Sequence, residues 1–162
     1  MTPQARSADA PHGGDVLYRK SFHIVGNDFE HGGEAAAEVK AILRQLGFPT
    51  EAIRRLSIAN FEAEMNVIMY ADEATLELAV LPDAVRVTVA DRGPGIPDVD
   101  WAMQEGNSTA TAEMRARGFG AGLGLPNIKR NCDAFTIEST VGAGTTLSYT
   151  VVANGSAGSA ST

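Results

Sequence analysis

Apolar and polar residues alternate along several short segments of the chain, which is the pattern of β-strands that bury one face. The first such segment, residues 16–24, stands alone near the N-terminus. Later segments come in two pairs, joined by Pro82-Asp83 in the first pair and by Gly142-Ala143-Gly144 in the second. We therefore predict one single strand and two hairpins, with the hairpin strands at residues 74–81, 85–90, 134–140 and 145–152.

Between the first strand and the first hairpin, apolar residues recur at helical spacing over two segments. The first predicted helix covers residues 34–46, and we expect Gly47 to end it. Thr50 is the expected N-cap of the second helix, which runs from residue 51 to about residue 71. The expected inner side of the first helix consists of Ala35, Val39, Ile42, Leu43 and Leu46.

The order of these elements predicts the fold class. A strand, two helices, a hairpin, a long loop with a short helical piece near residues 99–104, another helix and a second hairpin follow one another. This order predicts an α+β domain of two layers, in which helices cover one face of a mixed, mainly antiparallel sheet. We assign the domain to residues 16–152, between a flexible N-terminus at 1–15 and a flexible tail at 153–162.

Composition narrows the class of protein further. The chain has 162 residues, 44% of them hydrophobic and 20% charged, as expected for a globular domain with its own core. Its net charge of -7 disfavours direct binding to nucleic acid or to an anionic membrane. A single cysteine, Cys132, suits a reducing compartment, and no membrane-length apolar run or signal-peptide core is visible. We therefore expect a cytoplasmic protein.

A glycine occupies every second position from residue 118 to residue 124, within the sequence RGFGAGLGL. Each glycine in a regular element costs roughly 0.5–1 kcal/mol, so this pattern indicates a need for bare backbone. Main-chain amides that approach an anion, followed by the N-terminus of a helix at residues 125–132, form a phosphate-binding loop. A plain flexible turn is the alternative. The polar segment 107–117 excludes a preceding Rossmann strand, and no P-loop lysine motif is present.

Two further motifs precede the glycine-rich loop. Glu62 and Asn66 are four residues apart, so they share one face of the second helix and can meet one ligand. Asp91 comes at a strand end, followed by Gly93 and Gly95, which let a flat group approach the backbone. Taken singly, Asp91 could be a turn residue and Asn66 a surface amide.

Together, E-x-x-x-N, D-x-G-x-G and G-x-G-x-G resemble the N, G1 and G2 boxes of the ATP-binding fold shared by gyrase, Hsp90, histidine kinases and MutL. The resemblance covers about residues 57–146. It implies a Bergerat-type fold, a two-layer α/β sandwich that binds ATP and Mg²⁺, over residues 16–152.

The resemblance also implies residue roles. Asp91 would accept a hydrogen bond from the adenine amino group, and Asn66 would hold Mg²⁺. The glycines of the loop would hold the phosphates, and Thr145 or Thr146 would supply a hydroxyl that supports the adenine-binding acid. The implied nucleotide contacts are Asn66, Asp91, Gly93, Gly95, Ile96, Arg115, Arg117, Gly120, Ala121, Gly122, Leu123, Gly124, Leu125, Thr145 and Thr146.

Glu62 indicates the branch of this family. Histidine kinases show N-x-x-x-N at this helix, whereas Asn60 is two residues too early, and no histidine of the chain lies in an H-E-x-x-x-P context. The carboxylate of Glu62, one helical turn before Asn66, can take the proton of a hydroxyl nucleophile. Glu64 is about 200° around the helix from Glu62, so it does not share the face of Asn66. The pattern resembles bacterial anti-sigma regulatory factors and switch-protein kinases, which phosphorylate Ser or Thr of STAS-domain (anti-anti-sigma) proteins.

The segment AMQEGNSTA, with RGFGAGLGLPNIKR after it, resembles the switch-kinase branch of stress-signalling modules in particular. The resemblance implies a serine/threonine-protein kinase with Glu62 as catalytic base and Arg115 or Arg117 as a clamp on the γ-phosphate. An ATP-gated anti-sigma module that sequesters a sigma factor without significant turnover stays open, as does a nucleotide-binding domain without catalysis. The resemblance also suggests a homodimer through the N-terminal strand.

Overall fold

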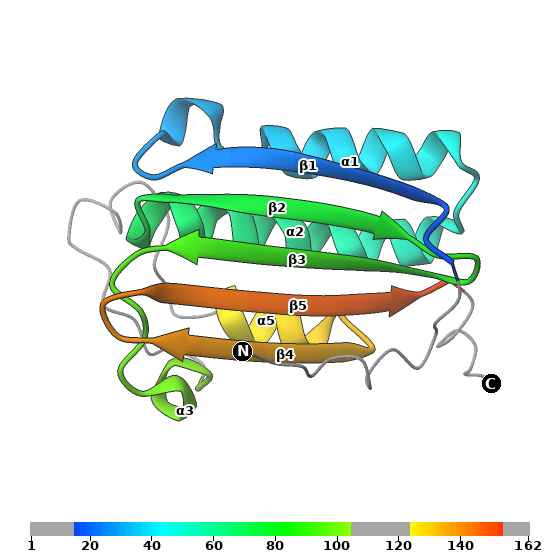
Figure 1. The fold of residues 1–162 in the computed structure, drawn as a ribbon. Helices are drawn as coiled ribbons and strands as arrows, with labels where there is room; N and C mark the ends of the chain where they lie inside the picture. The colour runs from blue at the N-terminus through cyan, green and yellow to red at the C-terminus, as the bar shows by residue number, and fades with distance from the viewer. Residues whose placement is uncertain (1–14, 105–123, 154–162) are drawn as a thin grey trace.

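The computed structural model describes residues 15–104 and 124–153, which form one five-stranded sheet and its covering helices (Figure 1). The strands lie in the order β1-β2-β3-β5-β4, and every neighbouring pair is antiparallel. The expectation of a mixed sheet is therefore corrected to a purely antiparallel one over the described residues. The strand bounds are β1 (Tyr18–Val25), β2 (Glu73–Val80), β3 (Ala84–Arg92), β4 (Ala134–Thr140) and β5 (Gly144–Val152).

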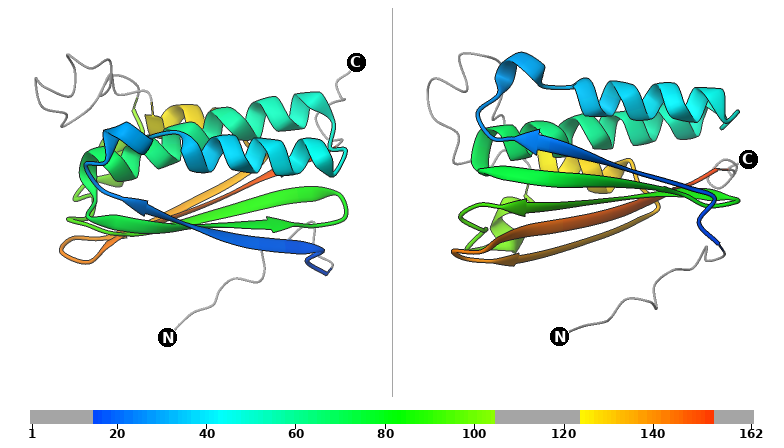
Figure 2. Two further views of the ribbon diagram at one scale, coloured as in Figure 1. Left: turned by 90° about the horizontal axis from the view of Figure 1, so that it is seen from above. Right: turned by 45° about the horizontal axis from the view of Figure 1, so that its top comes forward.

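Three helices cover one face of the sheet, and none of the described helices packs on its other face (Figure 2). They are α1 (Glu34–Gln45), α2 (Thr50–Tyr70) and α5 (Gly124–Arg130), and a 3-10 helix (Phe29–His31) and α3 (Val99–Ala102) complete the described helices. The two-layer α+β architecture is confirmed. The core lies between the layers, where every second residue of the central strands is buried, as the alternation predicts. None of the described helices is long and apolar enough to cross a membrane.

The end of α1 confirms one expected signal and corrects two others. Gly47 has a φ of 81°, and hydrogen bonds from Gly47 N to Arg44 O and from Phe48 N to Leu43 O close the helix as a Schellman motif. Because the chain turns there, Leu46 is 50% exposed rather than buried. Helix α2 begins at Thr50 itself, with Pro49 at the N-cap position and no side-chain cap.

Helix α5 has the sides that its sequence predicts. Leu125 and Ile128 are buried in the core and Cys132 packs against it, whereas Lys129 and Arg130 are exposed. Burial raises the pKa of the Cys132 thiol to about 12, so this cysteine is protonated at neutral pH and a poor nucleophile.

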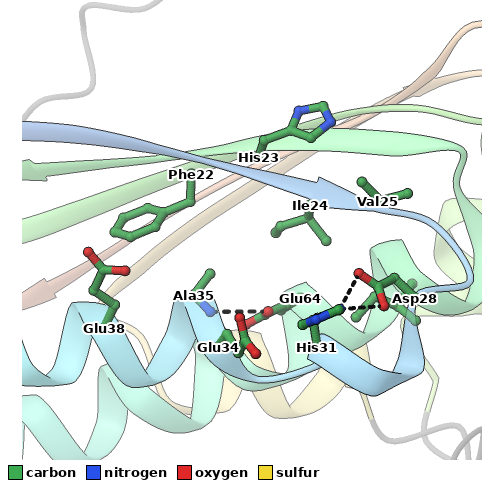
Figure 3. A pocket seen from close by; sticks show the side chains of 11 residues that line it. Phe22, His23, Ile24, Val25, Asp28, His31, Glu34, Ala35, Glu38 and Glu64 are labelled. Carbon is green, nitrogen blue, oxygen red and sulfur yellow. Dashed lines mark hydrogen bonds and ion pairs between the residues drawn. The ribbon is translucent and has the colours of Figure 1, made fainter.

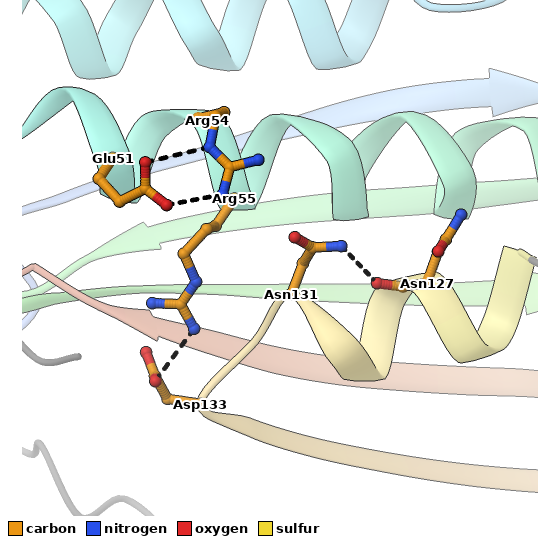
Figure 4. A network of polar contacts seen from close by, with 6 residues as sticks. All are labelled: Glu51, Arg54, Arg55, Asn127, Asn131 and Asp133. Carbon is orange, nitrogen blue, oxygen red and sulfur yellow. Dashed lines mark hydrogen bonds and ion pairs between the residues drawn. The ribbon is translucent and has the colours of Figure 1, made fainter. Parts of the chain in front are cut away.

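An ion pair joins α2 to the start of β4. Arg55 Nη2 lies 3.0 Å from Asp133 Oδ1, and the other carboxylate oxygen of Asp133 accepts a 2.7 Å hydrogen bond from Val152 N (Figure 4). The same carboxylate thus contacts both a helix and the end of β5, which fixes the junction between α5 and β4 against α2.

A buried hydrogen bond joins α2 to β5 through the core. Tyr149 Oη donates to Asn60 Oδ1 at 2.7 Å, and both residues are 1% exposed. Burial raises the pKa of Tyr149 well above its usual range, which keeps the phenol protonated and able to donate.

Replacing Tyr149 by phenylalanine is expected to lower the free energy of unfolding by about 1–3 kcal/mol, because the amide oxygen of Asn60 then stays buried without its donor. Urea denaturation followed by circular dichroism measures the change. Tyr18→Phe is the control, since Tyr18 is 39% exposed, and its effect should stay within about 0.5 kcal/mol. Equal midpoints for the two variants would contradict the role of the buried pair.

Candidate active site

Asp91 lies near the end of β3, beside the first residues of β5. Its Oδ1 accepts a 3.0 Å hydrogen bond from Thr145 N. Burial raises the pKa of the Asp91 carboxyl, the charge of Asp72 raises it further, and the amide of Thr145 opposes both effects. Oδ2 has no hydrogen-bond partner among the residues that the structure describes, so it is available to accept a hydrogen from a ligand.

Tight backbone packing surrounds Asp91. Gly144 has a φ of 140°, and a Cβ there would lie 2.1 Å from the carbonyl oxygen of Asp91. Gly95 has a φ of 78°, and its Cβ would lie 2.3 Å from the carbonyl oxygen of Thr140. A side chain at Gly93 would meet Ala71 at 3.0 Å. These glycines therefore let neighbouring backbone segments close around the carboxylate, a reason that differs from the ligand approach expected from the sequence.

The hydroxyl groups of Thr145 and Ser139 form a pair next to Asp91. Thr145 Oγ1 is 2.7 Å from Ser139 Oγ, which also accepts a 2.7 Å hydrogen bond from Ile96 N. The sequence predicts a threonine hydroxyl on Asp91, but the contact comes from the backbone amide of Thr145, and Thr146 is exposed. This corrects the expected mode of support. Ser139 was not predicted, although it pairs directly with Thr145 across β4 and β5.

Glu62 faces the start of α5. Its Oε2 accepts a 3.3 Å hydrogen bond from Asn127 Nδ2, and a Cβ added to Gly124 would lie 3.4 Å from its Oε1. Asn66 follows one turn later on α2 and is half-buried, with no hydrogen bond to its side chain from the described residues. A carboxylate oxygen and an amide oxygen are thus presented on the same face of one helix.

Glu64 points elsewhere, as helical spacing predicts. It is 3% exposed and accepts hydrogen bonds from the backbone amides of Gly33, Ala35 and Ala36, at 3.1, 3.2 and 2.9 Å. Figure 3 shows its carboxylate against the first turn of α1, in a cavity between β1 and α1. Glu64 therefore binds the N-terminus of α1 and does not share the site of Glu62.

Several expected ligand contacts lie outside the described residues: Arg115, Arg117, Gly120, Ala121, Gly122 and Leu123. Of the glycine-rich segment, the structure describes Gly124, which begins α5, and Leu125, whose side chain is 7% exposed and belongs to the core. Leu125 can therefore meet a ligand only through its backbone.

The donor set fits a nucleotide-bound magnesium ion. In the described ranges, no group of three or more His, Cys, Asp or Glu side chains could hold a metal alone. Mg²⁺ in nucleotide sites commonly takes one or two protein oxygens and completes its shell with phosphate and water. The amide oxygen of Asn66 is a ligand of this kind.

Comparisons with known proteins identify the family of the chain. The histidine kinase-like ATPase domain family matches residues 26–151. Serine/threonine-protein kinase RsbT of Bacillus subtilis (strain 168) is 32% identical over 110 residues, which cover 65% of this chain and 77% of RsbT. An anti-sigma F factor of Caldanaerobacter subterraneus subsp. tengcongensis is 33% identical over 121 residues, covering 72% of this chain and 81% of that factor.

The fold has a solved counterpart. A chain of the SiaB-SiaC complex from Pseudomonas aeruginosa superposes with a TM-score of 0.52 at 17% identity, over 85% of this chain and 90% of that chain. At this identity the likeness concerns the fold alone. With the family match over most of its length, the chain belongs to the histidine kinase-like ATPase domain family, in the branch that includes RsbT and the anti-sigma F factors.

Proposed function

We propose that this protein is an ATP- and Mg²⁺-dependent serine/threonine-protein kinase and anti-sigma regulatory factor, which acts on a STAS-domain anti-anti-sigma partner in a partner-switching pathway. The observation that carries the proposal is the pair of Glu62 and Asn66 on one face of α2, with Glu62 directed at the start of α5. RsbT, a relative at 32% identity, is named a serine/threonine-protein kinase. ATP as the donor places the proposed activity in the cytoplasm.

Asp91 supplies the adenine contact in this proposal. Its Oδ1 is held by the amide of Thr145, so Oδ2 can accept a hydrogen from the exocyclic amino group of adenine. Guanine presents a carbonyl oxygen at the same position, and two acceptors would repel each other. The carboxylate therefore favours ATP over GTP.

Glu62 acts as general base. The hydroxyl oxygen of a serine or threonine of the partner attacks the γ-phosphorus, and its proton passes to Oε1 of Glu62. The bond between the γ-phosphorus and the β,γ-bridging oxygen breaks, and that oxygen leaves with ADP. Mg²⁺ held by Asn66, when bound, supplies neutralising charge for the phosphates, and Arg115 or Arg117 is the proposed clamp on the γ-phosphate.

Self-association is part of the proposal. β1 is an edge strand of the sheet, and three apolar side chains at or beside it are exposed, Leu17 at 64%, Tyr18 at 39% and Val25 at 49%. An edge strand with exposed apolar side chains is suited to pairing with a second copy of the chain.

A second candidate function follows from the anti-sigma F factors among the relatives. In that case the protein is an ATP-gated module that sequesters a sigma factor and transfers phosphate slowly or not at all. The same nucleotide site then controls binding rather than catalysis.

Incubation with γ-³²P-labelled ATP, Mg²⁺ and candidate STAS-domain proteins separates the two functions. A kinase transfers label to a serine or threonine of one partner, and phosphoamino-acid analysis identifies the residue. If ATP binds by calorimetry but no STAS-domain protein is labelled, the kinase proposal fails. ATP-dependent capture of a purified sigma factor then establishes the second function.

A further inference from the structure

We propose that Asn127 is a positioning residue for Glu62, holding one carboxylate oxygen so that the other faces the start of α5 as proton acceptor. The inference rests on the proposed kinase function and deepens it. Its central contact is the 3.3 Å hydrogen bond from Asn127 Nδ2 to Glu62 Oε2, between α5 and α2.

The hydrogen bond makes the two oxygens of Glu62 unequal. Oε2 accepts from Asn127, whereas Oε1 lies beside Gly124, which has no side chain to cover it. Among the described residues, no hydrogen-bond donor contacts Oε1. A base held through one oxygen has its other oxygen aimed in a fixed direction, which limits the rotation that a free glutamate side chain would have.

Neighbouring charges fix the orientation of the Asn127 amide. Arg130 Nη1 donates to Asn127 Oδ1, and the carboxylate of Glu62 lies on the side of Nδ2. A guanidinium has only donors and a carboxylate only acceptors, so the amide oxygen must face Arg130 and the amide nitrogen must face Glu62. Two successive hydrogen bonds therefore link the three side chains, from Arg130 to Asn127 and from Asn127 to Glu62, which only accepts.

The backbone of α5 holds Asn127 in place. Leu125 and Ile128 anchor the helix in the core, and Asn131 Nδ2 donates to the backbone oxygen of Asn127 at 2.9 Å (Figure 4). An amide is needed here, because aspartate could accept from Arg130 but could not donate to Glu62. Aspartate would also set a second negative charge beside the base.

Steady-state kinetics of Asn127→Asp tests the role. General-base catalysis accelerates a reaction by about 10²–10⁴-fold. We expect kcat to fall about tenfold in Asn127→Asp, because the base remains but is no longer held in position. The KM for ATP should change by less than about twofold, because the side-chain hydrogen bonds of Asn127 in the described structure go to Glu62 and Arg130 and not to Asp91 or Asn66. Lys129→Ala, on the exposed side of the same helix, is the matched control with unchanged kcat. Wild-type kcat in Asn127→Asp overturns the inference.

A double-mutant cycle with Glu62→Gln tests whether Asn127 acts through Glu62. In the Glu62→Gln background, Asn127→Asp should change the residual transfer rate by less than about twofold, since the base is already gone. A loss equal to that in the wild-type background means that Asn127 acts by another route, and overturns the inference.

NMR of the ¹⁵N-labelled protein tests the contact itself without reference to activity. The side-chain amide proton of Asn127 that faces Glu62 should move upfield in Glu62→Gln, because a neutral acceptor polarises it less, and should stay in place in Lys129→Ala. An unmoved resonance in Glu62→Gln overturns the inference. Absence of phosphate transfer by the wild-type protein overturns the proposed kinase instead, so the two failures are distinct.

Discussion

Replacing Glu62 by glutamine is expected to lower kcat for phosphate transfer to the partner by about 10²–10⁴-fold, because glutamine keeps the size of the side chain but cannot take the proton. The dissociation constant for ATP should stay within about twofold, since the proposed adenine and metal contacts are untouched. Quantitative transfer of ³²P from ATP and isothermal calorimetry measure the two quantities. Undiminished transfer would remove Glu62 from the reaction.

Glu64→Gln is the matched control, two residues along the same helix. The carboxylate of Glu64 accepts from three backbone amides at the start of α1, and hydrogen bonds to a charged group are stronger than those to a neutral one. We expect a loss of about 1–3 kcal/mol in the free energy of unfolding, with transfer by the folded protein retained. The two glutamates should thus separate catalysis from stability.

Asp91→Asn is expected to weaken ATP binding by about 10- to 100-fold, as hydrogen bonds to charged groups contribute about 1.5–3 kcal/mol. The side-chain oxygen of asparagine can still accept the hydrogen bond from the amide of Thr145. The side chain, however, no longer offers adenine a charged acceptor. Calorimetric titration with ATP and GTP measures the loss and should show weaker preference for ATP. Asp83→Asn, directly before the first residue of β3, is the control, and equal affinity in the two variants would argue against the adenine contact.

The same substitution should leave the ligand-free fold intact or make it more stable. The pKa of Asp91 is raised in the folded state, so the folded protein holds this proton more tightly than the unfolded chain does. The stability that this group contributes is therefore present at low pH and is lost as pH rises through its raised pKa. Thermal unfolding of ligand-free Asp91→Asn at pH 7 should give a Tm equal to or above that of the wild type.

The sequence predicts the helices, their faces and the hairpin turns well, because each of these features depends on a few adjacent residues. Gly47 ends α1 through its own positive φ, and the four-residue spacing of Glu62 and Asn66 fixes their common face on any α-helix. The opposite direction of Glu64 follows from the same geometry. The hairpin around Pro82-Asp83 is local in the same sense.

The missed residues depend on contacts between segments that are far apart in the chain. Ser139 supports the Asp91 region only because β4 and β5 pair in a register that sets it opposite Thr145. Asn127 meets Glu62 across 65 positions of sequence, through the packing of α5 on α2. The hydrophobic periodicity of a single segment cannot predict such contacts between segments.

Helix α2 is attached along its length to three other parts of the fold. Glu64 binds α1, Asn60 bonds to Tyr149 in β5, and Arg55 pairs with the carboxylate before β4. These contacts fix α2 to the rest of the fold at three points along its length. The distance between Glu62 and its amide partner Asn127 is set by the packing of the seven-residue α5 against α2, so the contacts that stabilise the fold also position the proposed base.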